Sequence, residues 1–282
     1  MSPASAEGDG GAEPRFAILF WFFKDFDTCR ARAEALRARN PGVALYGLYG
    51  GPPEEAGAAR AAMAQVLDDL HVYAGPEDSY WKWIHGDQLI ADWHARRGRH
   101  LPWRQLLVAQ WDLLLAAPLS EIAAELRPDE AAFTGDRPLA EVATWWGWAG
   151  RGGEVQAAEM AAFRALLVER LAYSGPLWCC LFIAAVLPRA FLDAHQAAGA
   201  PAPGFLEYKL PTLARVFGTP VRALPQLAAW WRKDPATQGA PLRERVLNAT
   251  REPVDPAVIA AELARPGGRR AFHPVFELTP WG

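Results

Sequence analysis

The chain has 282 residues, of which 51% are hydrophobic and 22% are charged, a balance typical of a soluble globular protein with a sizeable core. The formal net charge of −3 gives no electrostatic reason to expect nucleic acid or an anionic membrane as a partner. The three cysteines are odd in number and lack metal-ligand spacing, which argues against a disulfide framework and favours a cytoplasmic location.

Residues 1–15 are rich in Gly, Ala and acids and have no basic region followed by an apolar one, so we expect a disordered tail and not a signal peptide. The longest apolar runs are about ten residues, which is too short to span a bilayer. Residues 16–282 are expected to form a single domain.

The first part of that domain alternates between apolar runs and helical patterns. Strands are predicted at 16–23, 43–49 and 68–73, and helices at 28–39 and 54–67. This strand–helix order over about 60 residues is typical of a parallel sheet with right-handed crossovers. The first strand ends in the polar turn Lys24–Asp25, where the carboxyl edge of such a sheet would lie.

A helix is predicted next, over residues 81–97, with Trp83 facing the sheet and His85 and Asp87 on the helix surface. Within it, Lys82 is expected to extend its charged end to solvent beside the packed tryptophans. The stretch 106–109 then predicts a strand that is buried on both faces.

Asp112 follows that strand closely, and a carboxylate among apolar residues is costly to bury without a partner. A metal ion, a backbone nest or a cationic side chain would each serve as the partner. In open α/β sheets ligands bind outside the carboxyl ends of the strands, where Asp112 would lie. The alternative is that Asp112 caps a following helix at residues 113–117.

The second part of the chain is less regular. A glycine- and tryptophan-rich loop is predicted at 142–153, a helix at 154–172, an apolar run at 177–186 and a helix at 204–218. Residues 219–282 are Pro-rich and predict an irregular C-terminal part that covers the sheet edge.

Several signature motifs are absent from the sequence. There is no P-loop, no G-x-G-x-x-G after the first strand, no G-x-S-x-G elbow and no zinc cluster. A nucleotidyltransferase is also less favoured, because no Gly- and Lys/Arg-rich signature follows the first strand.

The ordered set of motifs resembles a glycosyltransferase with the GT-A, nucleotide-diphospho-sugar transferase, fold. Four features come in that family's order: the turn Lys24–Asp25, the Gln110-Trp111-Asp112 stretch in place of a D-x-D, the strand and helix of 181–191, and the helix of 204–218 with Glu207 in place of x-E-D. His273 stands where many members supply a late histidine. Gln110 and Tyr208 each replace an acid of the family pattern.

The resemblance implies an α/β, Rossmann-like three-layer sandwich with a mostly parallel central sheet, and transfer of a sugar from a nucleotide-diphosphate sugar to an acceptor hydroxyl. It implies a divalent cation, Mn²⁺ or Mg²⁺, that arrives with the donor. The implied roles are as follows: Glu207 as catalytic base; Asp112 and His273 as metal ligands; Trp21, Phe23, Lys24 and Trp111 at the nucleotide sugar; and Trp145, Trp146 and Trp148 on the acceptor side.

Other interpretations stay open at this stage. His273 also fits a satisfied core histidine, and Glu207 fits a residue that complements a helix dipole. Because fold does not fix function, a catalytically silent sugar- or nucleotide-binding protein on the same fold is the main alternative to an enzyme.

Overall fold

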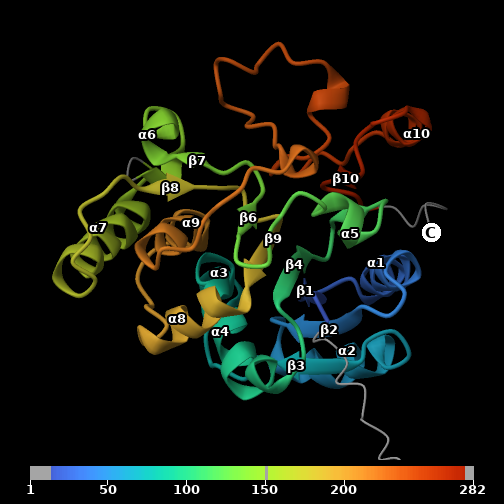
Figure 1. The fold of residues 1–282 in the computed structure, drawn as a ribbon, viewed down its shortest axis with the longest axis horizontal. Coiled ribbons are helices and arrows are strands. Elements are labelled where there is room, and N and C mark those ends of the chain that lie inside the picture. The colour runs from blue at the N-terminus through green and yellow to red at the C-terminus, as the bar shows by residue number, and fades with distance from the viewer. Residues whose placement is uncertain (1–13, 150–151, 277–282) are drawn as a thin grey trace, which may run out of the picture.

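The computed structural model describes residues 14–149 and 152–276, and its centre is a six-stranded sheet in the order β3-β2-β1-β4-β9-β6 (Figure 1). The first four strands in the chain run parallel, and β9 and β6 each pair antiparallel to their neighbour. The sheet strands are β1 (Phe16–Phe22), β2 (Ala44–Tyr49), β3 (Asp69–Val72), β4 (Gln105–Gln110), β6 (Ala132–Phe133) and β9 (Ala184–Pro188).

Helices cover both faces of this sheet, with α1 and α2 on one side and α3, α4 and α8 on the other (Figure 1). They are α1 (Phe26–Arg39), α2 (Ala56–Met63), α3 (Ser79–Ile84), α4 (Gly86–Arg96), α5 (Leu119–Ile122), α6 (Leu139–Val142), α7 (Glu154–Glu169), α8 (Arg189–Ala197), α9 (Leu206–Val216) and α10 (Pro256–Ala264). The expected α/β sandwich with a mostly parallel sheet is confirmed. Every residue of β1 is buried, as expected for a strand covered on both faces.

Two small antiparallel pairs lie outside the main sheet. One joins β5 (Leu114–Leu115) to β10 (Ala271–Phe272), and the other joins β7 (Arg137–Pro138) to β8 (Trp178–Cys179). The helix considered for residues 113–117 was therefore wrong, because that stretch pairs as a strand with the C-terminal part of the chain. Short 3₁₀ turns complete the structure at Pro53–Glu55, Gly98–His100, Gly147–Ala149, Pro225–Leu227 and Leu242–Glu244.

The helix expected over residues 81–97 is broken at His85. The ring of Trp21 approaches Gly86 so closely that a Cβ on this residue would lie 2.2 Å from a ring carbon. Glycine is the residue that permits such a close approach, and the chain starts a new helix there. As a result His85 and Asp87 are buried, not on the surface, and Trp83 is 44% exposed and does not face the sheet.

Lys82 was also misplaced by the sequence pattern, because its side chain is buried, not extended to solvent. Its ammonium donates to the carbonyl of Gly51 at 3.2 Å and lies 5.8 Å from the ring centre of Tyr73. Of the predicted tail, 1–15, residues 1–13 lie outside the described residues. Arg15, at the end of this stretch, donates to the side chain of Gln105 at 3.0 Å.

The C-terminal part, 219–282, is less irregular than expected over the residues that the structure describes. It contributes α10 and β10, and a small second core forms where Ile259 and Phe272 pack with Leu114 of β5. Residues 277–282 lie outside the described residues. This packing holds the C-terminal part against the sheet's carboxyl edge, at Asp112.

Candidate functional site

The candidate site lies at the point in the sheet where the order in which strands are added changes direction. From β1 the chain moves outward to β2 and β3, and it then returns to place β4 on the other side of β1. Ligands of open α/β sheets bind in the crevice at such a switch point, outside the carboxyl ends of the strands. Trp21 pairs with Gln110 in the ladder, so the residues after β1 and after β4 emerge side by side.

Phe23, Lys24 and Trp111 form a group at this edge. Phe23 is 37% exposed and meets the Trp111 ring edge-on, with ring centres 6.1 Å apart. The Lys24 ammonium lies 5.2 Å and 5.1 Å from the centres of these two rings. The edge therefore offers an accessible cation and an exposed aromatic ring above a buried one.

Trp21 lies apart from this accessible group, although it was grouped with it from the sequence. Only 6% of the residue is exposed, because its ring packs against Gly86 and contacts Phe182. The structure gives Trp21 a packing role beneath the site.

Asp112 and His273, which are 161 residues apart in the chain, meet at this edge. The Nε2 atom of His273 lies 3.0 Å from Oδ1 of Asp112. The pairing of β5 with β10 brings them together, because it sets Phe272 opposite Leu114, and the Val275 N–H donates to the Asp112 carbonyl at 2.9 Å. The side chains keep exposures of 13% and 7%, so the pair borders solvent.

The hydrogen bonds of His273 determine where its protons lie. Its Nδ1 is 2.6 Å from the carbonyl oxygen of Asn248, which can only accept, so Nδ1 carries a hydrogen. Its Nε2 then faces the Asp112 carboxylate, and that contact needs either a second proton or a cation between the two groups. Metal-binding histidines commonly have this arrangement, with the distal ring N–H bound to a carbonyl.

This donor set fits a divalent cation that the protein holds only in part. Within the described ranges, no group of three or more His, Cys, Asp or Glu side chains could hold a metal ion. Mg²⁺ keeps several waters and is usually bound by one or two carboxylates together with substrate phosphates. Asp112 and His273 therefore suit a cation shared with a diphosphate.

Arg32 provides a cationic neighbour for Asp112 from within the protein. The residue is buried, and its Nη2 donates to the Val275 carbonyl at 3.1 Å. Burial lowers the pKa of the Arg32 guanidinium, and the charge of Asp112 acts in the opposite direction. Part of the negative charge of Asp112 is thus balanced before any metal binds.

Glu207 lies in the first turn of α9, and its carboxylate accepts the N–H of Phe182 at 2.9 Å. Its own carbonyl accepts the N–H of Cys180, so the start of α9 is attached to the chain segment that precedes β9. Burial raises the pKa of Glu207 from 4.5 to about 8, although the Phe182 hydrogen bond acts to lower it. A carboxyl group with such a pKa can take or give a proton near neutral pH.

The helix that carries Glu207 is anchored by a buried ion pair that the sequence did not reveal. Lys209 lies two residues after Glu207 in α9, and its ammonium is 2.8 Å from Oδ2 of Asp87 in α4, with both side chains fully buried. His195 of α8 lies 3.6 Å from the same oxygen. This cluster joins three helices beneath the candidate base.

The three acceptor-side tryptophans of the 142–153 loop are all half-buried, and aromatic contacts link them. Trp145 and Trp146 meet Trp231 edge-on at 5.8 Å and 5.6 Å between ring centres. Trp148 instead stacks on Phe205 at 4.1 Å, one residue before α9. Trp146 also lies 6.2 Å from the Phe205 ring, so Phe205 links Trp146 to Trp148, while Trp145 and Trp146 share the contact with Trp231. Gly150 and Arg151 of this loop lie outside the described residues.

Trp145 and Trp146 border a cavity of about 410 Å³ that we call the tryptophan pocket. Its walls come from the 145–147 loop, from Leu181, and from two C-terminal segments, 230–233 and 249–252. The C-terminal segments were missed in the sequence because that region has no periodic pattern. The run Trp230-Trp231-Arg232-Lys233, which combines rings with charges, was the signal available.

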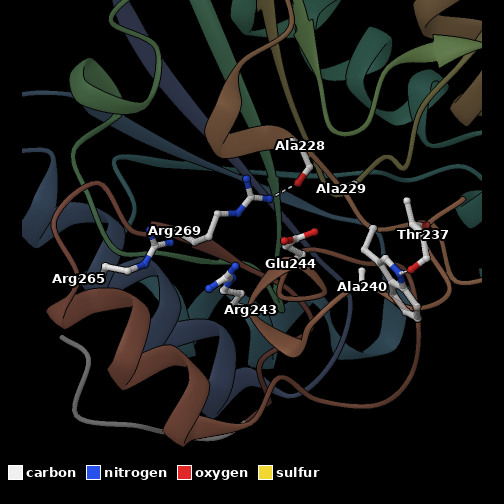
Figure 2. A pocket seen from close by; sticks show the side chains of 9 residues that line it. Ala228, Ala229, Thr237, Ala240, Arg243, Glu244, Arg265 and Arg269 are labelled. Atoms are coloured by element: carbon white, nitrogen blue, oxygen red, sulfur yellow. Dashed lines mark hydrogen bonds between the residues drawn. The ribbon is translucent and has the colours of Figure 1, made fainter.

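A second cavity, of about 420 Å³, shares Trp230 with the tryptophan pocket and is rich in arginine (Figure 2). Arg269 donates there to the carbonyls of Pro225 and Ala228, and Arg265 pairs with Glu262. Because these guanidinium groups bind protein oxygens, this arginine pocket holds the C-terminal part together.

Comparison with known proteins gives distant structural matches. No family model matches the chain, and no curated protein matches it. Mouse xyloside xylosyltransferase 1 in its apo form is 12% identical, with a TM-score of 0.39 over 77% of this chain and 87% of that one. The galactosyltransferase LgtC, in complex with donor and acceptor sugar analogs, is 10% identical, with a TM-score of 0.42 over 86% and 81%.

The apo structure of the bifunctional glycosyltransferase WbbM is 10% identical, with a TM-score of 0.46 over 100% of this chain and 48% of that one. These similar structures are glycosyltransferases, the class that the sequence motifs resemble. Across the described residues, no helix is long and apolar enough to cross a membrane.

Proposed function

We propose that this chain is a glycosyltransferase that moves a sugar from a nucleotide-diphosphate sugar to an acceptor hydroxyl. The observation that carries the proposal is the 3.0 Å contact between Asp112 and His273 at the switch point of the sheet. It brings two candidate metal ligands together beside Lys24, at the edge where such folds bind their ligands.

The donor would lie across this edge. Phe23 and Trp111 offer rings against which a base or sugar packs, and Lys24 offers a positive charge to the diphosphate. Asp112 and His273 would hold the Mn²⁺ or Mg²⁺ ion, which when bound neutralises the charge that grows on the leaving diphosphate. Trp21 would keep these groups in position from below.

Glu207 would act as the base toward the acceptor. Its carboxylate would take the proton of the acceptor hydroxyl as the oxygen bonds to the sugar carbon and the diphosphate leaves. Because burial raises its pKa to about 8, the carboxylate fraction grows as the pH rises through neutrality. The rate of transfer should therefore increase with pH up to about 8 and then level off.

The experiment that tests the base role is Glu207→Gln, which keeps the shape and removes the proton acceptor. We expect donor binding to stay at the wild-type level and transfer to fall at least about 100-fold, the usual minimum for loss of a general base. Glu154→Gln is the matched control, because Glu154 is an exposed acid in the first turn of α7. If both variants transfer at the wild-type rate, Glu207 only complements a helix dipole.

A catalytically silent nucleotide- or sugar-binding protein is the second candidate. The observation that favours it is that His273 and Asp112 bond directly, without a third metal-type ligand among the described residues. Such a protein would bind a nucleotide sugar and release no nucleoside diphosphate, with or without Mn²⁺. Nucleotide release from any donor by the wild type, lost in Glu207→Gln, would exclude it.

A further inference from the structure

Two residues that line the tryptophan pocket are each next in the chain to a residue that contacts the candidate site. Leu181 lines it, and the next residue, Phe182, donates its N–H to Glu207. Ala249 also lines it, and the preceding residue, Asn248, accepts from His273. Chain neighbours of the lining residues thus contact the candidate base, Glu207, and one candidate metal ligand, His273.

The size and walls of the pocket suit a saccharide unit. Its volume of about 410 Å³ lies in the range of small-molecule sites. Trp231 is 4% exposed and fixes Trp145 and Trp146 by edge-on contacts, so these half-buried rings have defined positions. Flat, immobile rings of this kind pack well against the apolar face of a sugar ring.

The charge on the rim is strongly unbalanced. Arg232, Lys233 and Arg251 face a single acid, Glu252. Within the described part of the chain, none of these three cations has a hydrogen-bond or ion-pair partner for its side chain, and all three are exposed. The arginine pocket differs, because Arg265 and Arg269 are bound there to protein oxygens.

Exposed charges on a protein surface are usually just solvated, so the cations alone would mean little. Here they surround a cavity with aromatic walls next to both halves of the site. We propose that the tryptophan pocket is the acceptor site and that the acceptor is an acidic saccharide, bearing a phosphate or a carboxylate. This inference rests on the proposed transferase function, which it deepens by naming the acceptor class.

The test is an NMR-detected titration with three probe sugars: methyl glucoside, methyl glucuronide and glucose 6-phosphate. The wild type should bind the two acidic probes about tenfold more tightly than the neutral one, and added salt should reduce this preference. The variant Arg232→Gln/Lys233→Gln/Arg251→Gln should bind all three probes alike. A preference for only one acidic probe would identify phosphate or carboxylate as the recognised group.

The matched control is Arg164→Gln/Arg170→Gln/Arg243→Gln, which removes the same charge from three exposed positions outside the tryptophan pocket. It should keep the wild-type preference. Equal binding of acidic and neutral probes by the wild type would overturn the inference, and so would an equal loss of preference in both triple variants. Circular dichroism and thermal melts confirm that each variant is folded.

A parallel titration with uridine and guanosine diphosphates plus Mn²⁺ separates this inference from the proposed function. If a nucleotide binds and the acidic preference is absent, the transferase stands and the acceptor class is wrong. If no nucleotide binds, the transferase fails and the pocket loses its acceptor role. If the pocket variant loses affinity for the nucleotide instead of the acidic sugar, the cations serve the donor, which overturns the inference.

Discussion

Two aspartates with basic partners, Asp87 and Asp112, show how burial separates a structural ion pair from a candidate site. Asp87 and Lys209 are fully buried and 2.8 Å apart, between α4 and α9. Asp112 and His273 are 3.0 Å apart at the sheet edge and border solvent. A ligand can reach the second pair without unfolding the protein, so a similar contact has a different use at each place.

The charge state of Asp87 follows from its surroundings. Burial alone would raise the pKa of this carboxyl, but the Lys209 ammonium and the His195 ring outweigh it and hold the pKa below its usual value of 3.8. A buried charge that loses its partner is strongly destabilising. Asp87 and Lys209 should therefore matter for stability, whereas Asp112 should matter for binding.

The largest effect is expected for Lys209→Met, which leaves the Asp87 carboxylate buried and without its ammonium. We expect the free energy of unfolding to fall by about 3–5 kcal/mol, measured by urea denaturation at pH 7. The double variant Asp87→Leu/Lys209→Met should recover most of this loss, because no uncompensated charge remains. A loss below about 1 kcal/mol in the single variant would mean that the buried pair does not anchor α9.

An intermediate effect is expected for Glu207→Gln and depends on pH. The folded protein keeps Glu207 protonated up to a pKa of about 8, whereas the unfolded chain ionises it near 4.5. Between these values the unfolded state binds fewer protons, so the wild type loses stability as the pH rises. Glu207→Gln removes this term and should be the more stable protein at pH 9, with little difference at pH 4.

Urea denaturation of both proteins at pH 4, 7 and 9 gives this comparison. A constant difference between them at all three pH values would contradict the raised pKa of Glu207. It would also weaken the base role, because a carboxylate with an ordinary pKa is a weaker proton acceptor at neutral pH.

The smallest effect on stability is expected for Asp112→Asn, which keeps the shape and removes the charge. Asparagine keeps an oxygen that can accept a hydrogen bond from His273, so the free energy of unfolding should fall much less than in Lys209→Met, again from urea denaturation. A loss comparable to that of Lys209→Met would make Asp112 a structural residue and erase the difference between the two pairs.

Three of the four parallel strands, β1, β2 and β4, were predictable because apolar runs bounded by turn residues carry a strong local signal, whereas β3 was expected from its place after a helix. The strands β5 and β10 were not, since two residues are too few to show a period. The break before Gly86 was also hidden, and the ring packed against that glycine, Trp21, belongs to a distant strand.

The meeting of Asp112 and His273 was expected from the order of motifs and not from local physics. The burial of Asp87 was missed because its partner, Lys209, lies on another helix, and on its own Asp87 fits an exposed helix position. The C-terminal wall of the tryptophan pocket was missed for a related reason, since segments without a period give no indication of what they face.

The most direct test of the account is a calorimetric titration of uridine and guanosine diphosphates into the wild type and Asp112→Asn, with and without Mn²⁺. We predict that the wild type binds one of them with Mn²⁺ and much more weakly without it. Asp112→Asn should lose at least about tenfold in affinity, the least that is usual even for residues that only support a metal ligand. Binding that ignores both Mn²⁺ and the substitution would contradict the account.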